Sequence, residues 1–163
     1  SDTDLELGTT YYYQVGAFNN IDKGYSSAIV ASGESRFAVP GKLEAEAYSD
    51  AHEGVNTEGT TDTGGGFNIG HFEVDRWVEY DINVAEAGEY TVEYRIATEV
   101  GSDGFELRQG DAVLDTVLIE ATGGWQTYVT LSSTITLTEG ESTLRLHSFG
   151  NQWNLNWINV TKN

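Results

Sequence analysis

Trp125 lies in the sequence Thr-Gly-Gly-Trp-Gln-Thr, where two glycines stand directly before a large aromatic ring. Glycines in this place favour a loop tip that leaves one face of the ring open. An open indole face can stack on the C–H face of a pyranose ring while polar side chains around it bind the hydroxyl groups. The alternative is a core tryptophan beside a turn. We favour the open ring and expect a ligand site at this loop.

A second group of aromatic and amide side chains occupies residues 149–154, which read Phe-Gly-Asn-Gln-Trp-Asn. The amide of Asn154 offers an acceptor and two donors in one plane, which suits the binding of hydroxyl groups. Trp153 follows two polar residues, so we expect its ring to flank the ligand site. Trp157 alternates with Leu155 in an apolar strand, and we expect it in the core.

Two carboxylates, Glu44 and Glu46, are two residues apart and would point the same way on a strand. Such a pair suits general acid–base catalysis or the binding of calcium, and surface acids in contact with water are the alternative. Glu73 and Asp75 near His71 are further acid–base candidates. Acids are so numerous that pairs arise by chance, and the chain has no cysteine and no Gly-x-Ser-x-Gly sequence. We therefore expect no enzymatic activity.

These residues must be positioned by strands, because the apolar pattern has a period of two. Apolar and polar side chains alternate over residues 90–96, which indicates a strand buried on one face. Turn sequences at 109–111 and 139–141 separate further alternating runs, and residues 154–160 form a final strand. No segment shows a sustained helical period. The sequence predicts an all-β protein.

The charge restricts the partners more than the fold. The 163 residues include 26 acids and 8 bases, which gives a net charge of −18. Nucleic acid requires a basic surface, and anionic membranes or sulfated polymers would be repelled. No window of about 18 apolar residues is present, so we expect no membrane span, and we find no signal peptide. A neutral ligand or a bound cation fits this composition best.

The motifs of residues 36–163 resemble carbohydrate-binding modules of family 6. The matching segments follow one another in the family order and lie at residues 43–48, 61–70, 77–80, 87–95, 122–127 and 154–158. The resemblance implies a β-sandwich jelly roll and a secreted parent enzyme that degrades polysaccharides. It also implies one or two structural calcium ions, held by Glu44, Glu46 and a residue near Asn156.

The resemblance also implies roles for the ligand residues. Trp125 would form one wall of the main site, and Asn154 would bind sugar hydroxyls at its floor. The family usually has a tyrosine after Asn-x-Gly as the opposite wall, where this chain has His71. His71 would contact the sugar through polar atoms. Alternatively His71 is a surface residue, and the ring of Trp153 or Phe67 supplies the second wall.

A second family site would lie on the concave face of the sandwich. Trp77 and Glu79 are two residues apart and would share that face. This pair is a second candidate ligand site, which requires that the face is open to a ligand.

Residues 1–34 resemble the C-terminal third of a fibronectin type III domain. The match rests on residues 7–15, where Leu-Gly-Thr-Thr-Tyr-Tyr-Tyr-Gln-Val has the spacing of a tyrosine corner. About three of the seven strands of such a domain fit into this stretch. We predict two parts, a partial fibronectin-like segment with a linker over 1–34 and a carbohydrate-binding module over 35–163.

These observations predict a non-catalytic, secreted module that is monomeric within a multidomain enzyme. It would bind a neutral polysaccharide, either agarose or another marine galactan, or a β-glucan, and target an attached glycoside hydrolase to it. A structural or adhesive β-sandwich without sugar binding, or a small glycosidase, would be the alternative. Exposure of the aromatic rings decides between binding and a silent module.

Overall fold

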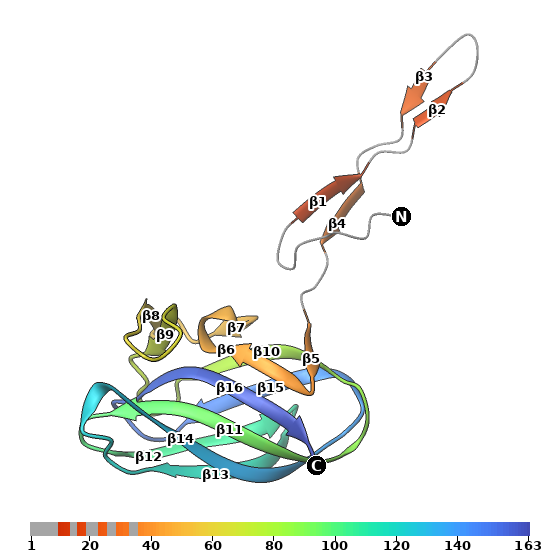
Figure 1. The fold of residues 1–163 in the computed structure, drawn as a ribbon. Coiled ribbons are helices and arrows are strands. Elements are labelled where there is room, and N and C mark those ends of the chain that lie inside the picture. Colours follow the sequence, from red (N-terminus) through yellow and green to blue (C-terminus); the bar gives the residue numbers. More distant parts are fainter. Residues whose placement is uncertain (1–9, 14–15, 19–22, 26–28, 33–35) are drawn as a thin grey trace. The chain divides into compact units, whose positions relative to one another are not determined.

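The computed structural model describes residues 10–13, 16–18, 23–25, 29–32 and 36–163. The chain divides into two compact units, Ser1–Ser35 and Arg36–Asn163. In the first unit, β1 (Thr10–Tyr13) pairs with β4 (Ile29–Ser32) and β2 (Gly16–Phe18) pairs with β3 (Lys23–Tyr25), both antiparallel (Figure 1). The predicted tyrosine corner includes residues 7–9 and 14–15, which lie outside the described residues. The fibronectin-like remnant stays a prediction.

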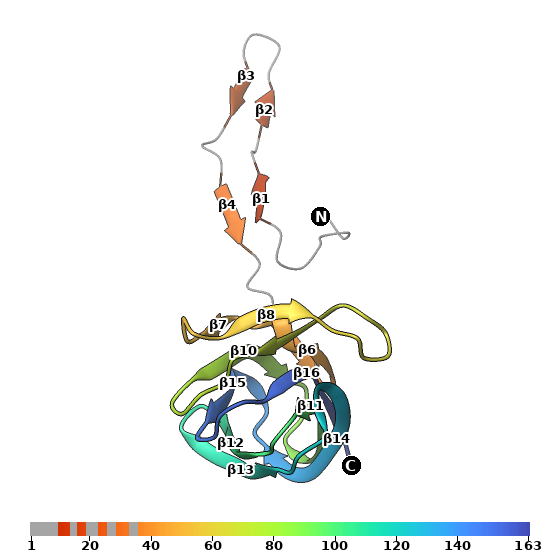
Figure 2. The same cartoon turned by 90° about the vertical axis from the view of Figure 1, so that its left-hand side faces the viewer.

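The second unit is a sandwich of two six-stranded sheets, seen from two sides in Figures 1 and 2. One sheet has the order β13-β12-β15-β10-β5 with β7 also on β10, and the other has the order β14-β11-β16-β9-β8 with β6 also on β16. The bounds of the first sheet are β5 (Phe37–Val39), β7 (Asp50–Ala51), β10 (Trp77–Val84), β12 (Ser102–Gln109), β13 (Ala112–Ile119) and β15 (Gly140–Ser148). Those of the second are β6 (Gly41–Glu44), β8 (Asn56–Gly59), β9 (Phe67–Gly70), β11 (Gly88–Thr98), β14 (Gly124–Leu137) and β16 (Asn154–Lys162). The predicted all-β jelly roll is confirmed.

A single turn of 3₁₀ helix, η1 (Ala45–Ala47), interrupts the strands after β6. Within the residues that the structure describes, no helix has the length and apolar character needed to cross a membrane.

The core lies between the sheets and follows the predicted alternation. Along β11, the side chains of Tyr90, Val92, Tyr94 and Ile96 are fully buried, whereas the intervening residues face outward. Both predicted turns lie between strands. Gly110 joins the paired strands β12 and β13, whereas Gly140 begins β15 where the chain passes from β14 in the other sheet. Both glycines have positive φ, which other residues rarely adopt.

Trp153 belongs to this core, so the inference from its polar neighbours that the ring lies outside the core is wrong. Its ring is fully buried and stacks on Phe72 with the centroids 3.9 Å apart, and Phe105 stacks at 5.0 Å. The indole Nε1–H donates a hydrogen bond of 3.0 Å to Ser148 Oγ, so its polar atom is satisfied. Gln152 has a φ of +64°, and this turn separates the buried ring from its exposed neighbours.

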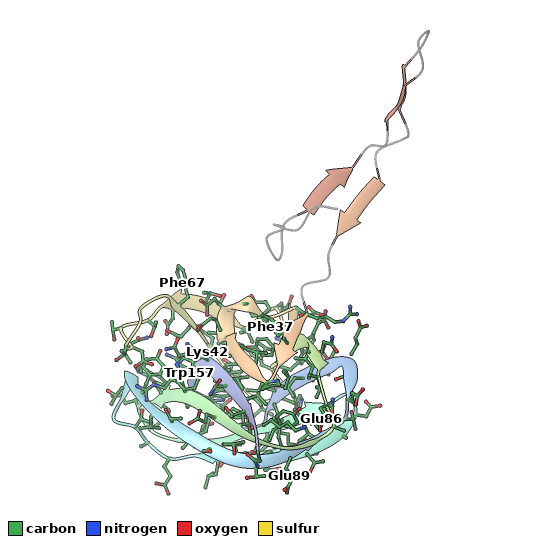
Figure 3. The ribbon with its side chains drawn as sticks, turned by 45° about the vertical axis from the view of Figure 1, so that its right-hand side comes forward. Phe37, Lys42, Phe67, Glu86, Glu89 and Trp157 are labelled. Atoms are coloured by element: carbon green, nitrogen blue, oxygen red, sulfur yellow. The ribbon has the colours of Figure 1, made fainter. Side chains whose placement is uncertain are left out.

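Trp157 shows the opposite error, because it lies on the outer face of β16 rather than in the core. Its neighbours Ile158 and Val160 point inward, and the register against β11 shifts between Arg95 and Ile96. The ring is half-buried, and the Lys42 ammonium lies 5.1 Å from its centroid, as can be followed in Figure 3.

The pairing register brings several strand ends to one end of the sandwich. Thr98 of β11 pairs with Gly124 of β14, and Ala97 lies opposite Asn154 of β16. The loops that follow β11, β13 and β15 therefore meet there with the residues after β9. The loop before β14 forms the left-hand end of the sandwich in Figure 1. This end carries the candidate site.

Candidate functional site

A cavity of about 470 Å³ opens among these loops, within the usual range of about 300–1,000 Å³ for small-molecule sites. Its lining comes from β8, β14, β16 and the loops after β9 and β15, and consists of Glu58, His71, Phe72, Glu73, Trp125, Gln126, Gln152, Trp153 and Asn154. The predicted residues Trp125, Asn154, His71 and Trp153 therefore all line one cavity. Trp153 lies beneath it, stacked under Phe72.

Trp125 forms the open aromatic wall of the cavity. Its side chain is 37% exposed, and Gly123 before it has a φ of +94°. The loop is fixed by Thr122, whose Oγ donates to the Thr98 carbonyl at 2.7 Å and accepts from the Thr98 N–H at 2.9 Å. The ring is thus presented on a braced loop, ready to stack against a flat apolar surface.

Asn154 at the floor is 5% exposed and has both amide hydrogens engaged. Its Nδ2 donates to Glu58 Oε1 at 2.8 Å and to the Trp125 carbonyl at 2.9 Å. The amide oxygen remains as its side-chain acceptor and lies beside Gly70. Asn154 is therefore prepared to accept a hydrogen bond from a ligand hydroxyl rather than to donate one.

Glu58 is a site residue that the sequence analysis missed. Its Oε1 also accepts from Asn68 Nδ2 at 3.1 Å, and Gln126 Nε2 donates to Asn68 Oδ1 at 3.2 Å. The network thus joins β8, β9, β14 and β16 across nearly 100 residues of sequence. No local motif marks Glu58, since it stands in an exposed strand among many other acids.

His71 and Glu73 of the loop after β9 also line the cavity, and Arg76 holds this loop. Arg76 donates to the carbonyls of His71 and Gly54 and, at 2.6 Å, to the Glu73 carboxylate. His71 is exposed and has a φ of +59°, so this clamp maintains an uncommon backbone conformation. Arg76 is a second residue that sequence reasoning missed.

Phe67, the other proposed second ring, is not part of the cavity lining. It is 54% exposed on β9, and Figure 3 shows it projecting from the surface. With Trp153 buried and Phe67 outside the lining, His71 is the remaining candidate for the second wall among the residues named from the sequence.

Glu44 and Glu46 line another cavity, of about 310 Å³, together with Asn156, Lys42 and Trp157. The two carboxylates do not share a strand face as predicted, because β6 ends at Glu44 and Glu46 lies in η1. The turn of 3₁₀ helix nevertheless directs both toward the same space. Glu46 Oε2 is buried and has no hydrogen-bond partner, which fits a place for a cation.

The two carboxylates of this cavity are too few to bind a cation by themselves. No group of three or more histidine, aspartate or glutamate side chains arranged to hold a metal occurs among the described residues. A calcium ion would need backbone or amide oxygens in addition to the two carboxylates, and calcium commonly binds such oxygens. Asn156 Nδ2 donates to Asp62 at 2.8 Å, which leaves its Oδ1 as the acceptor.

Asp62 fastens the glycine-rich loop above this cavity to the sheet. Its carboxylate is 6% exposed and accepts two hydrogen bonds from Arg95, at 2.7 and 2.8 Å. The bonds from Arg95 are the main reason that the pKa of Asp62 falls from 3.8 to about 2, and Asn156 adds to the effect. The ionised carboxylate is therefore part of the folded state.

The pKa of Asp62 predicts an acid-dependent loss of stability. A depressed pKa in the folded state contributes stability that is complete above the unfolded value and is lost as pH falls toward about 2. We expect the wild type to lose about 2 kcal/mol more free energy of unfolding than Asp62→Asn between about pH 5 and pH 2. Urea titrations across this range measure the difference, and parallel pH curves would contradict it.

Trp77 and Glu79, the pair considered for a second site, lie half-buried on the outer face of β10. The Arg145 guanidinium lies 4.4 Å from the centroid of the Trp77 ring and bonds Glu79 at 2.6 Å. One face of the ring is therefore covered and the carboxylate is paired. A ligand at this place would have to displace Arg145.

Comparison with known proteins identifies the family of the module. The model of the family "Carbohydrate binding module (family 6)" matches residues 44–162. The chain belongs to this family. The matched residues include all those that line the main cavity of the module.

Solved structures of similar modules have the same sandwich. The family 6 module of Cellvibrio mixtus lichenase 5A, in complex with cellotriose, is 38% identical with a TM-score of 0.69, over 77% of this chain and 98% of that one. The C-terminal family 6 module of the marine laminarinase LamC from Zobellia galactanivorans is 35% identical with a TM-score of 0.68, over 74% and 98%.

Among curated proteins, the β-agarase AgaA of Microbulbifer thermotolerans is 34% identical over 71% of this chain and 29% of its own length. The chain spans between 6% and 29% of the length of the curated relatives that it matches. The module thus resembles one part of larger proteins.

Proposed function

We propose that this family 6 module binds a neutral polysaccharide at the Trp125 cavity and holds an attached glycoside hydrolase on that polymer. The observation that carries the proposal is an exposed tryptophan ring standing over a floor of hydrogen-bond acceptors. A pyranose stacked on Trp125 would donate hydroxyl hydrogens to Asn154 Oδ1 and Glu58. The module itself performs no catalysis.

The charge of the cavity supports a neutral sugar. Glu58 and Glu73 both line it, and the whole chain carries a net charge of −18. Carboxylates accept hydrogen bonds from sugar hydroxyls but repel sulfate and uronate groups. The ligand class is therefore a neutral glucan or galactan.

Among neutral polymers, a β-glucan is the first candidate and agarose the second. Similar modules come from a laminarinase and from a lichenase whose module was solved with cellotriose, and an agarase contains a similar segment. These polymers lie outside cells, which supports secretion of the parent protein. We further propose that the module acts as a monomer.

The test is calorimetric titration of the full chain with laminari-, cello- and neoagaro-oligosaccharides. We expect one series to bind with micromolar or weaker Kd, because a shallow site retains little free energy after the ligand is ordered. A folded chain that binds none of the three would overturn the proposal in favour of a structural module.

Gly70 allows a test of Asn154 without removing it. A Cβ at Gly70 would overlap Asn154 Oδ1, whereas a Cβ at Gly59 would meet nothing within 4 Å. We expect Gly70→Ala to displace the amide and weaken oligosaccharide binding about tenfold, a loss of one strong hydrogen bond of about 1.4 kcal/mol. Gly59→Ala should bind as the wild type does. Equal affinities for both variants, measured by calorimetry, would exclude the acceptor role of Asn154.

We also propose that Glu44, Glu46 and Asn156 hold a structural calcium ion. The buried, unpartnered Glu46 Oε2 supports this site. Bound calcium would tie the end of β6 to β16, which carries Asn156 and pairs with β6. It would stabilise the fold without entering the sugar cavity.

Calcium should raise the free energy of unfolding by about 2.7 kcal/mol at a concentration a hundredfold above its Kd. Glu46→Gln should remove this gain, and Glu89→Gln, at an exposed carboxylate on β11, should keep it. Thermal unfolding in calcium and in chelator measures both. A melting temperature that is independent of calcium would contradict the site.

A further inference from the structure

A second hollow lies next to the Trp125 cavity at the same end of the sandwich. Its volume is about 490 Å³, and it is bordered by the loops that follow β11, β13 and β15. Gln152 lines both hollows and separates them. The two spaces thus form neighbouring parts of one surface.

Gln152 is held firmly at this boundary. Its N–H donates to the Phe72 carbonyl at 2.9 Å, and its carbonyl accepts from Thr98 Oγ1 at 2.7 Å. The residue has a φ of +64°, which costs free energy in a residue other than glycine and is maintained by such surrounding bonds. The position of Gln152 between the two hollows is therefore fixed by these hydrogen bonds.

The second hollow offers the same chemistry as the first, with aliphatic side chains in place of the indole. Val100 and Leu118, which are 65% and 66% exposed, present their apolar side chains on its lining. Asp103 and Glu120 supply acceptors. Asn151 Oδ1 accepts from the Val74 N–H at 3.1 Å, so its amide hydrogens remain as donors.

We propose that the bound neutral polysaccharide continues from the Trp125 cavity across Gln152 into this second hollow, so that the module binds a segment of several sugars. This inference rests on the proposed function. The C–H faces of further sugars would contact Val100 and Leu118, and their hydroxyls would donate to Asp103 and Glu120. Anionic substituents on this part of the polysaccharide would be repelled by the carboxylates of Asp103 and Glu120.

The test compares oligosaccharide lengths in the full chain. Calorimetry with laminari-, cello- and neoagaro-oligosaccharides of about two to six units should show affinity rising about tenfold with length in the series that binds. The double variant Val100→Ser, Leu118→Ser should lose this rise and keep the affinity for the shortest ligand. Val113→Ser is the matched control, because Val113 is 51% exposed on β13 and lines neither hollow.

The outcomes separate this inference from the proposed function. A wild-type affinity that is independent of length, or a double variant that keeps the rise, would overturn the second hollow and leave the Trp125 site intact. Loss of short-ligand binding in the double variant would also overturn it, since that effect requires a change in the first cavity. If the folded chain bound none of the oligosaccharides, both the second hollow and the proposed function would be overturned.

Discussion

Replacing Trp125 by alanine should weaken oligosaccharide binding by about thirtyfold or more while the free energy of unfolding stays nearly unchanged. The ring is 37% exposed at the cavity, and the bond to Asn154 is accepted by the Trp125 backbone carbonyl, which the variant keeps. A dominant aromatic contact is worth about 2 kcal/mol or more, which corresponds to a loss of about thirtyfold in affinity. Calorimetric titration of both proteins with the oligosaccharide that binds measures this loss.

Phe67→Ala is the matched control for this prediction. Phe67 is also an exposed aromatic residue, at 54%, but it lies outside the cavity lining. We expect its alanine variant to bind as tightly as the wild type. If Phe67→Ala abolished oligosaccharide binding and Trp125→Ala retained it, the sugar site would have to be reassigned to the surface of β9.

Replacing Trp153 by alanine should have the reverse signature, a large loss of stability. The ring is fully buried between the stacked Phe72 and Phe105, and its N–H is bonded to Ser148. Truncating a large aromatic residue in a packed core costs about 3–5 kcal/mol. Urea denaturation should show a midpoint far below that of Trp125→Ala.

Trp153→Phe distinguishes core packing from ligand contact. A phenyl ring can keep the stack on Phe72, so this variant should recover most of the stability and the support of the cavity. If Trp153→Ala weakened binding without lowering stability, the ring would be a ligand contact after all.

The strands could be predicted because their signal is local. The alternation over residues 90–96 reports directly which face of β11 is buried. The exposure of Trp125 could also be predicted from its neighbours, since the preceding glycines form a turn that presents the ring at the surface. In such places the chemistry of neighbouring residues determines exposure.

Prediction failed where the chain turns or shifts within a few residues. The positive φ of Gln152 places Trp153 in the core despite its polar neighbours. The register shift in β11 and β16 leaves Trp157 on the outer face. Glu44 and Glu46 reach one cavity through a turn of 3₁₀ helix rather than along a strand. Hydrophobic periodicity does not encode any of these three irregularities.

Other site residues could not be found because their partners are distant in sequence. Glu58 is joined to Asn154 across 96 positions, and Arg145 covers Trp77 from the neighbouring strand. Arg76 acts on the backbone of His71 and Gly54, which no residue pattern reveals. Only the pairing of the strands brings these groups together.

The four tryptophans of the chain allow the most direct test of the central claim, because each stands at a different place. Trp125 lies at the main cavity and Trp77 on the outer face of β10. Trp153 lies in the core, and Trp157 lines the cavity that contains Glu44 and Glu46. The measurement is an NMR titration of the indole N–H signals with the oligosaccharide that binds. We predict the largest shift for Trp125, with Trp77 and Trp157 unchanged. A shift confined to Trp77 or Trp157, with Trp125 unmoved, would contradict the assignment of the sugar site.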